Sequence, residues 1–236
     1  MDHNEYGKGI FDENEHNRGR TFVSGMAGVY GLMFLGLLAS AAAAMFTLSS
    51  DFMWSLVFGH QFGFWAFLFA PLLLVMFAFP RVWGMSPGAA LGLFFVYALI
   101  NGLTLAVIFL AYDMGTIFLA FFSAAGMFGV MAVYGALTKA DLSGMRSFLL
   151  MGLFGIIIAS VLNFFFANGM LDMIISYVGI AIFLGLTAYD VQRIQRAMND
   201  PNNPNPTGVA VLGALHLYLD FLNIFLFMLR ILGRRR

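Results

Sequence analysis

The chain has 236 residues, of which 61% are hydrophobic and 10% are charged, and its formal net charge at pH 7 is zero. About one quarter of the residues of a soluble domain are charged, so this chain must expose apolar surface to lipid rather than fold as a water-soluble globule. The absence of cysteine excludes disulfide frameworks, cysteine-ligated metals and cysteine nucleophiles, and the balanced charge indicates no nucleic-acid partner.

The first 20 residues are polar, mixed in charge and without the apolar core of a signal peptide. We predict that residues 1–20 are a solvated cytoplasmic tail. Asp12, Glu13 and Glu15 beside His16 could bind a cation, but a disordered tail without a metal is the favoured interpretation.

Seven apolar segments follow, each long enough for a membrane-spanning helix. Only helices and closed barrels satisfy every backbone hydrogen bond in lipid, and these segments lack the short alternation of barrel strands. The predicted fold is therefore an all-α polytopic membrane protein, with a single seven-helix membrane domain over residues 21–233 and a basic C-terminal tail at 234–236. The predicted segments are 22–48, 61–80, 87–112, 115–138, 146–168, 172–194 and 207–232.

Positive charges predict the orientation in the membrane. Lysine and arginine occur before the first segment and in the second, fourth and sixth loops, but not in the first, third and fifth loops. We therefore expect a cytoplasmic N-terminus. The basic residues after position 229 would then lie outside if the seventh segment crosses fully. A full crossing is favoured over a re-entrant seventh segment. The basic residues on the expected cytoplasmic side are Lys8, Arg18, Arg20, Arg81, Lys139, Arg146, Arg193 and Arg196.

Glycine is frequent, with 26 residues, and several glycines recur along single segments. Small residues let helices approach closely in lipid, so we interpret these runs as packing seams. The runs are Gly25, Gly28 and Gly31, then Gly88 and Gly92, then Gly152 and Gly155.

Asp190 and Asp220 are the acidic residues that sit well inside predicted spans. An ionised group at membrane depth costs on the order of 3 kcal/mol, so each needs a partner or a function. A single such acid could simply join helices through hydrogen bonds, but two in consecutive spans favour a functional role. Asp220 lies roughly 20 Å into the seventh segment, deeper than Asp190 in the sixth. The pair can meet only if the seventh helix starts lower, tilts, or follows a loop that dips inward.

If the two carboxylates meet, they cannot easily both ionise in a low dielectric, and they would share one proton. Such a pair would act as a pH switch. Asp190 and Asp220 could also bind Ca²⁺, although other oxygen atoms would have to complete the site. We expect no other cofactor.

Polar neighbours extend this constellation. His216 and Asn223 share a helix face with Asp220. His216 could titrate near neutrality and interact with the acids, or it could be a packed neutral histidine. Arg81 could reach Asp190 as a counter-ion, or serve only topology and interfacial anchoring.

Asn101 and Asn163 lie within predicted spans. We expect interhelical hydrogen bonds from both, with the lining of an ion pathway as the alternative for these residues and for Asn223.

The chain lacks a His-Glu-x-x-His zinc motif and a Gly-x-Ser-x-Gly nucleophile elbow. We therefore do not expect an enzyme.

Two stretches around the acids resemble the signatures of the Bax inhibitor-1 family, the transmembrane Bax inhibitor motif proteins. The first, Ala188–Ile194, reads AYDVQRI and resembles A-Y-D-x-Q-x-I. The second, Ala214–Phe225, reads ALHLYLDFLNIF and resembles L-x-L-Y-L-D-F-I-N-L-F. Seven segments and the chain length fit the family over the whole chain, and His216 replaces the asparagine or serine that is usual there.

This resemblance implies a fold in which the seventh helix is central, surrounded by the other six. It implies a pH-sensitive Ca²⁺ leak in which Asp190 and Asp220 form the sensor. A basic residue on the second helix would latch the pair when closed, and Arg81 is the nearest candidate. Bacterial relatives reside in the inner membrane, and we expect this location here.

The leading hypothesis is a pH-sensitive calcium leak channel gated by the aspartate pair, with Ca²⁺, protons and the lipid bilayer as partners and a monomer as the working unit. The alternative is a non-conducting regulator of other membrane proteins, such as a membrane protease. In that case the acids would join helices and the N-terminal tail would contact the partner.

Overall fold

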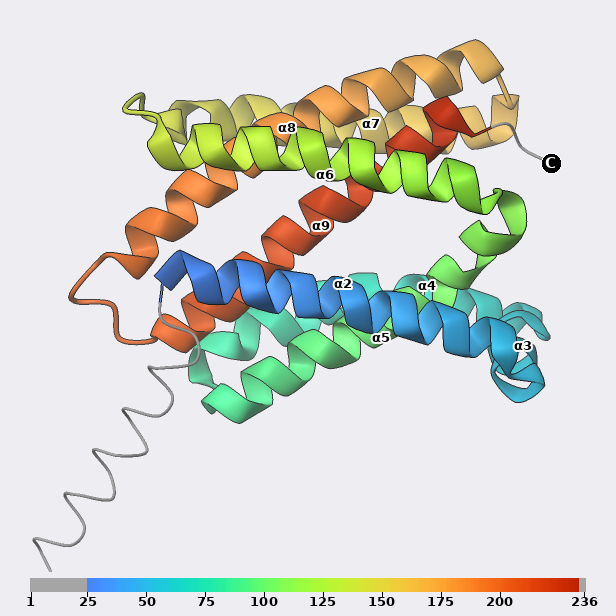
Figure 1. Cartoon of the computed structure of the whole chain (residues 1–236), viewed down its shortest axis with the longest axis horizontal. Coiled ribbons are helices and arrows are strands. Elements are labelled where there is room, and N and C mark those ends of the chain that lie inside the picture. The colour runs from blue at the N-terminus through green and yellow to red at the C-terminus, as the bar shows by residue number, and fades with distance from the viewer. Residues whose placement is uncertain (1–24, 234–236) are drawn as a thin grey trace, which may run out of the picture.

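A computed structural model of the chain describes residues 25–233 as a bundle of long helices (Figure 1). The predicted tails, including the Asp12–His16 cluster and Arg234–Arg236, lie outside the described residues. The described part of the chain contains helices and turns but no strand, as predicted. The α-helices are α2 (Gly25–Ser49), α3 (Asp51–Phe58), α4 (Gln61–Leu73), α5 (Pro87–Ala111), α6 (Met114–Leu137), α7 (Met145–Phe166), α8 (Gly169–Met198) and α9 (Pro206–Leu232).

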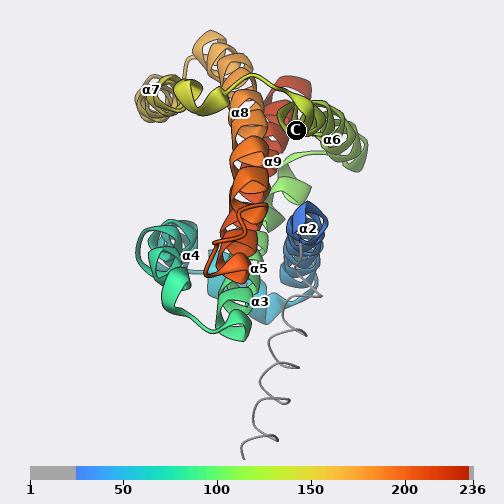
Figure 2. The same ribbon diagram turned by 90° about the vertical axis from the view of Figure 1, so that its left-hand side faces the viewer.

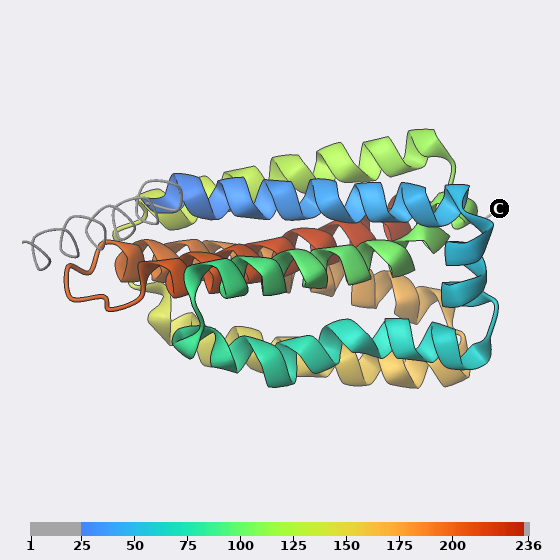
Figure 3. The same cartoon turned by 90° about the horizontal axis from the view of Figure 1, so that it is seen from below.

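The described residues form seven helical spans that are long and apolar enough to cross a membrane, the second of them running from Gln61 to Gly84, and they match the seven predicted segments closely. The largest difference is at α8, which has 30 residues and extends to Met198 rather than 194. A helix of this length measures about 45 Å, so its ends project beyond a hydrocarbon core of about 30 Å. The start of α2 and the end of α9 lie at opposite ends of the bundle (Figure 3). The seventh span is a continuous helix between those ends, as favoured from the sequence.

The short helix α3 occupies the predicted first loop. Ser50 has an extended backbone and its side chain accepts a hydrogen bond from Met53 N, while Asp51 adds an acid to the first turn. These are the features of a capped helix start. The eight-residue helix was not predicted, because its few turns give too short a pattern to separate from a loop.

The second span is irregular. Pro71 lies inside α4, and the chain then continues as a π-helical turn, Leu74–Ala78, and a 3-10 segment, Phe79–Gly84. Proline removes one backbone donor and disturbs the regular ladder. The second proline, Pro80, occupies the start of the 3-10 segment, where its missing N–H matters less. The two prolines therefore account for a span that changes its helical geometry.

The spans differ strongly in burial. In the most apolar window of α9, 72% of the residues are buried inside the protein, against 6% for the second span and 11% for α7. The second span and α7 therefore present most of their side chains to lipid. Exposed phenylalanine, leucine and methionine side chains on these outer helices form the lipid-facing surface.

Helix α9 lies between two groups of helices (Figures 1 and 2). It contacts α8 and α6 on one side, and α2 and α5 on the other. The second span packs mainly against α5, and α7 packs mainly against α8. The arrangement in which all six other spans surround the seventh is not confirmed, since the extensive contacts of α9 are with these four helices.

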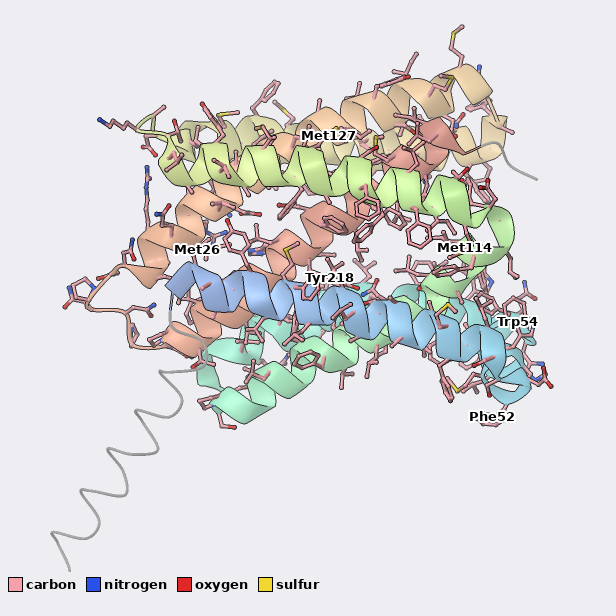
Figure 4. All side chains as sticks on the ribbon, in the orientation of Figure 1. Met26, Phe52, Trp54, Met114, Met127 and Tyr218 are labelled. Carbon is pink, nitrogen blue, oxygen red and sulfur yellow. The ribbon has the colours of Figure 1, made fainter. Side chains whose placement is uncertain are left out.

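A buried polar cluster joins α9 to α2 and α5. The Ser40 hydroxyl in α2 donates to Ala98 O in α5 at 2.7 Å and is hydrogen-bonded to the Tyr218 hydroxyl in α9 at 2.7 Å. Tyr218 is fully buried and lies beside α2 in the middle of the bundle (Figure 4). Its ring packs edge-on against Phe94 and Tyr97. The cluster therefore fixes three helices to one another.

The predicted glycine seams are largely wrong, although Gly152 on α7 does lie in close contact with Ile182 on α8. A methyl group added at Gly31, Gly88, Gly92 or Gly155 would meet open space, so these glycines do not mediate close packing. Close approaches occur at other glycines, because contact depends on which helix face meets a neighbour rather than on the spacing along one helix. At Gly102 a methyl group would strike the backbone of Ser40, and at Gly135 it would strike the backbone of Ala188.

Replacing Gly102 by valine should therefore separate α2 from α5 and lower the free energy of unfolding by at least ~2 kcal/mol, since backbone cannot move aside as a side chain can. The measurement is unfolding of the purified protein in mixed micelles by SDS titration. Gly92→Val, on the same helix but facing open space, is the matched control and should change stability little. Equal effects of the two substitutions would contradict the close contact.

Candidate functional site: a buried carboxylate pair

Asp190 on α8 and Asp220 on α9 lie on the two helices that share the most extensive contact in the molecule. Two close contacts fix their register: Gly213 faces Ile194, and Gly179 faces Phe227. Asp190 lies four residues before Ile194, and Asp220 lies seven residues after Gly213. Asp220 is therefore about three residues deeper, or roughly 4.5 Å along the axis.

The mismatch in depth is thus smaller than the sequence alone suggests. The contact between Gly213 and Ile194 also locates the helix ends. Helix α9 begins seven residues before Gly213, whereas α8 ends four residues after Ile194. The seventh helix starts about one turn further out, which is one of the three solutions considered above. Asn205 caps α9 through its side chain and donates to Trp83 O at 3.2 Å, which holds this start in place.

Both acids are buried. Asp190 is 8% exposed and Asp220 is 4% exposed. The Oδ2 atom of Asp220 is buried without a hydrogen-bond partner among the described residues. The next residue, Phe221, packs edge-on against Phe121 and Phe128 of α6. A buried ionised carboxylate with an unsatisfied oxygen is costly by several kcal/mol, so this position suits a protonated acid or a carboxylate that meets a cation.

The charges around the pair come from three helices. The carboxyl groups of Asp190 and Asp220 are close enough to act on one another electrostatically. Asp190 also interacts with His216 on α9, with Arg193 on its own helix and with Arg146 on α7. Like charges oppose ionisation of both acids together, whereas these basic groups favour an ionised Asp190. The structure therefore brings His216 within electrostatic range of Asp190.

Arg81 does not join this cluster. Its guanidinium donates to Phe77 O on its own segment, and the side chain is exposed. Among the described residues it makes no ion pair with Asp190. Phe79 and Val82 of the same 3-10 segment are buried in the core, whereas Arg81 lies on the exposed face of that segment.

The three asparagines hydrogen-bond locally instead of bridging helices. Asn101 donates to Tyr97 O and Asn223 donates to Leu219 O, each one turn back on its own helix. Asn163 accepts from the backbone N–H of Asn168 in the turn between α7 and α8. The expected interhelical bonds are absent at these described residues, because the main chain of the same helix offers a nearer partner.

Gln192, two residues after Asp190, carries a role that the sequence did not reveal. Its buried amide accepts from Leu142 N at 3.0 Å and donates to Ala140 O at 2.8 Å, both in the loop between α6 and α7. One turn further, Arg196 forms an ion pair with Asp141 at 2.8 Å. We call these contacts of residues 140–143 with α8 the loop clamp. The partners are about 50 residues away in sequence, so no local pattern points to them.

An open cavity of about 360 Å³ lies against the loop clamp, lined by Ser143, Tyr189, Gln192, Arg193 and Arg196, with Asp200 at its edge. It borders α8 beside Asp190. The described residues contain no group of three or more histidine or acidic side chains that could hold a metal. The acids therefore offer a two-carboxylate contact rather than a complete cation cage.

The loop clamp should persist across the physiological pH range. The Arg196 guanidinium beside Asp141 lowers the pKa of this carboxyl from 3.8 to about 2. Because the pKa of Asp141 is lower in the folded protein, its ion pair with Arg196 contributes fully to stability at any pH above the pKa of Asp141 in the unfolded chain. This contribution is lost as the pH falls through about 2. NMR titration of the Asp141 carboxyl carbon should therefore show a midpoint near 2 in the native protein. Arg196→Gln should raise that midpoint, and an unchanged midpoint would contradict the pairing.

Comparisons with known proteins identify the family of the chain. The family model described as "Inhibitor of apoptosis-promoting Bax1" matches residues 23–236. The chain is 40% identical to the "Inner membrane protein YbhL" of Escherichia coli K12 over 214 residues, covering 89% of this chain and 92% of that protein. It is 42% identical to a Borreliella burgdorferi protein over 213 residues, with the same coverage, and 37% identical to RP147 of Rickettsia prowazekii over 225 residues, covering 93% and 95%. The chain belongs to the Bax inhibitor-1 family.

Proposed function

We propose that this protein is a pH-sensitive Ca²⁺ leak channel of the inner membrane, gated by Asp190 and Asp220. The observation that carries the proposal is the burial of two interacting carboxyl groups on the helices with the most extensive mutual contact, one with an unsatisfied oxygen. A structural acid would be expected to have its oxygens paired. The inner-membrane location follows that of the Escherichia coli relative, which is named an inner membrane protein.

The proposed mechanism rests on the shared proton. At low pH one proton bridges or neutralises the pair, and α8 and α9 stay in contact. At high pH both acids ionise, repel one another and favour separation of the helices on the side of the loop clamp. The cavity beside Tyr189 and Gln192 would then connect to the acids and admit a cation.

The same geometry suits passage of Ca²⁺ better than its retention. Ca²⁺ takes six to eight oxygen ligands in a tight site. Two carboxylates supply only part of such a shell, and His216 beside Asp190 opposes a second positive charge when it is protonated. A site that attracts a cation weakly enough to release it is what conduction requires.

The first test is Ca²⁺ flux into proteoliposomes as a function of external and internal pH. We expect native flux to fall at least roughly fivefold from about pH 8 to about pH 6. The double substitution Asp190→Asn with Asp220→Asn should remove this pH dependence, because neither amide titrates. Asp51→Asn, an exposed acid at the start of α3, is the matched control.

An unchanged pH profile in the double variant would overturn the gating mechanism. Absence of Ca²⁺ flux at every pH from native, folded protein would overturn the leak itself. That second outcome would favour the non-conducting regulator, including one that acts on a membrane protease.

His216 should set the pH at which flux changes. A protonated His216 favours the ionised form of Asp190, so it opposes proton uptake by the pair. His216→Asn should therefore move the flux profile to higher pH, by roughly half a unit, without abolishing it. Asn223→Ala, on the same face of α9 but bonded to Leu219 O, serves as control. A shift to lower pH in His216→Asn would contradict this role.

A further inference from the structure

A second polar cavity lies at the other end of the bundle, where α7 ends, α8 begins and α9 finishes. Its volume is about 340 Å³, within the range of about 300–1,000 Å³ that is usual for small-ligand sites. The polar side chains that line it are Ser160, Asn163, Asn168, Asp172 and Arg230. None of these residues belongs to the carboxylate pair or to the loop clamp.

One charge of each sign faces this cavity. Arg230 Nη1 and Asp172 Oδ1 are 3.5 Å apart, and their side chains are 38% and 32% exposed. This separation exceeds the 2.8 Å of the Arg196–Asp141 pair and is long for a charged hydrogen bond. The guanidinium also lies over the Phe227 ring, 5.4 Å from its centroid. The Phe227 ring thus holds Arg230 in position. Its N–H donors and the Asp172 oxygens keep hydrogen-bonding capacity that their mutual contact does not fill.

The two asparagines orient amide donors beside these charges. Asn163 Oδ1 accepts from Asn168 N at 3.0 Å, and Asn168 Oδ1 accepts from Met170 N and Leu171 N. The oxygen atoms are therefore occupied by the backbone. No described residue accepts a hydrogen bond from the Nδ2 group of either asparagine. Ala167, in the left-handed conformation with φ of 49°, makes the tight turn that sets the two side chains beside one another.

The rim of the cavity is apolar and faces lipid. Phe164, Phe165, Phe166 and Met170 are 80%, 76%, 74% and 76% exposed. They lie at the end of α7 and the start of α8, and we expect acyl chains to meet headgroups at such helix ends. A ligand that reaches the charges through this rim would have acyl chains beside its polar group.

We propose that this cavity binds the headgroup of a zwitterionic phospholipid that carries a phosphate and a primary ammonium group. Arg230 and the asparagine amides take the phosphate oxygens, and Asp172 takes the ammonium group. A purely anionic headgroup would leave Asp172 beside a negative charge. With a cytoplasmic N-terminus, as predicted, the lipid belongs to the outer leaflet. The site is independent of the proposed ion leak.

Native mass spectrometry of the full chain, released from detergent with defined lipids, tests the assignment. The native protein should retain phosphatidylethanolamine at least roughly tenfold more tightly than phosphatidylglycerol of the same acyl chains. Arg230→Gln should lose this retention by a similar factor. Asp172→Asn should reduce the preference for phosphatidylethanolamine over phosphatidylglycerol while keeping the binding of both.

Arg196→Gln, which removes an exposed arginine at the opposite end, should leave lipid retention unchanged. Melting curves establish that each variant is folded. Asn163→Ala is a milder substitution and should cause a smaller loss of phosphatidylethanolamine retention than Arg230→Gln. Equal retention of the two lipids by native protein, or native-like preference in a folded Arg230→Gln, would overturn the site. Soluble phosphoethanolamine that binds as tightly as the lipid would overturn its assignment to a membrane headgroup.

Discussion

The unsatisfied carboxyl oxygen of Asp220 is the constraint around which the rest of the molecule is arranged. In a soluble protein, water could reach such an atom, but here it lies in the most buried helix of a membrane bundle. Its environment must therefore supply either a proton or a cation. Asp190, His216 and the arginines near α8 are the groups that decide which of these it receives.

Helix α9 is held differently on its two sides. Toward α2 and α5 it is fixed by short hydrogen bonds at Ser40 and by aromatic packing around Tyr218. Toward α8 the close contacts are apolar, between Gly213 and Ile194 and between Gly179 and the Phe227 ring. The side that carries the acids is therefore the side with fewer directional contacts, which suits a helix pair that separates when the acids repel one another.

The sequence predicted most of the fold because lipid imposes long apolar helices with clear boundaries. It also predicted that Asp190 and Asp220 lie within consecutive spans, where the structure buries both, because their positions follow from the apolar runs around them. It did not reveal the partners of Gln192, the Ser40–Tyr218 bond or the position of Arg81. These depend on contacts between distant segments, or on the 3-10 geometry after Pro80, which a hydrophobic pattern does not encode. The glycine prediction failed for the same reason, because spacing along one helix does not identify the face that meets a neighbour.

The position of α9 has a consequence for how the protein is made. Helices α2 to α5 contact one another, α6 to α8 contact one another, and α9 is the element with extensive contacts to both groups. It also follows the six other spans along the chain. Until α9 has been synthesised, the six preceding spans can therefore form only two weakly joined halves, each with an uncovered inner face. Premature termination before residue 206 would leave both halves without their common partner, and such chains should be substrates for membrane quality control.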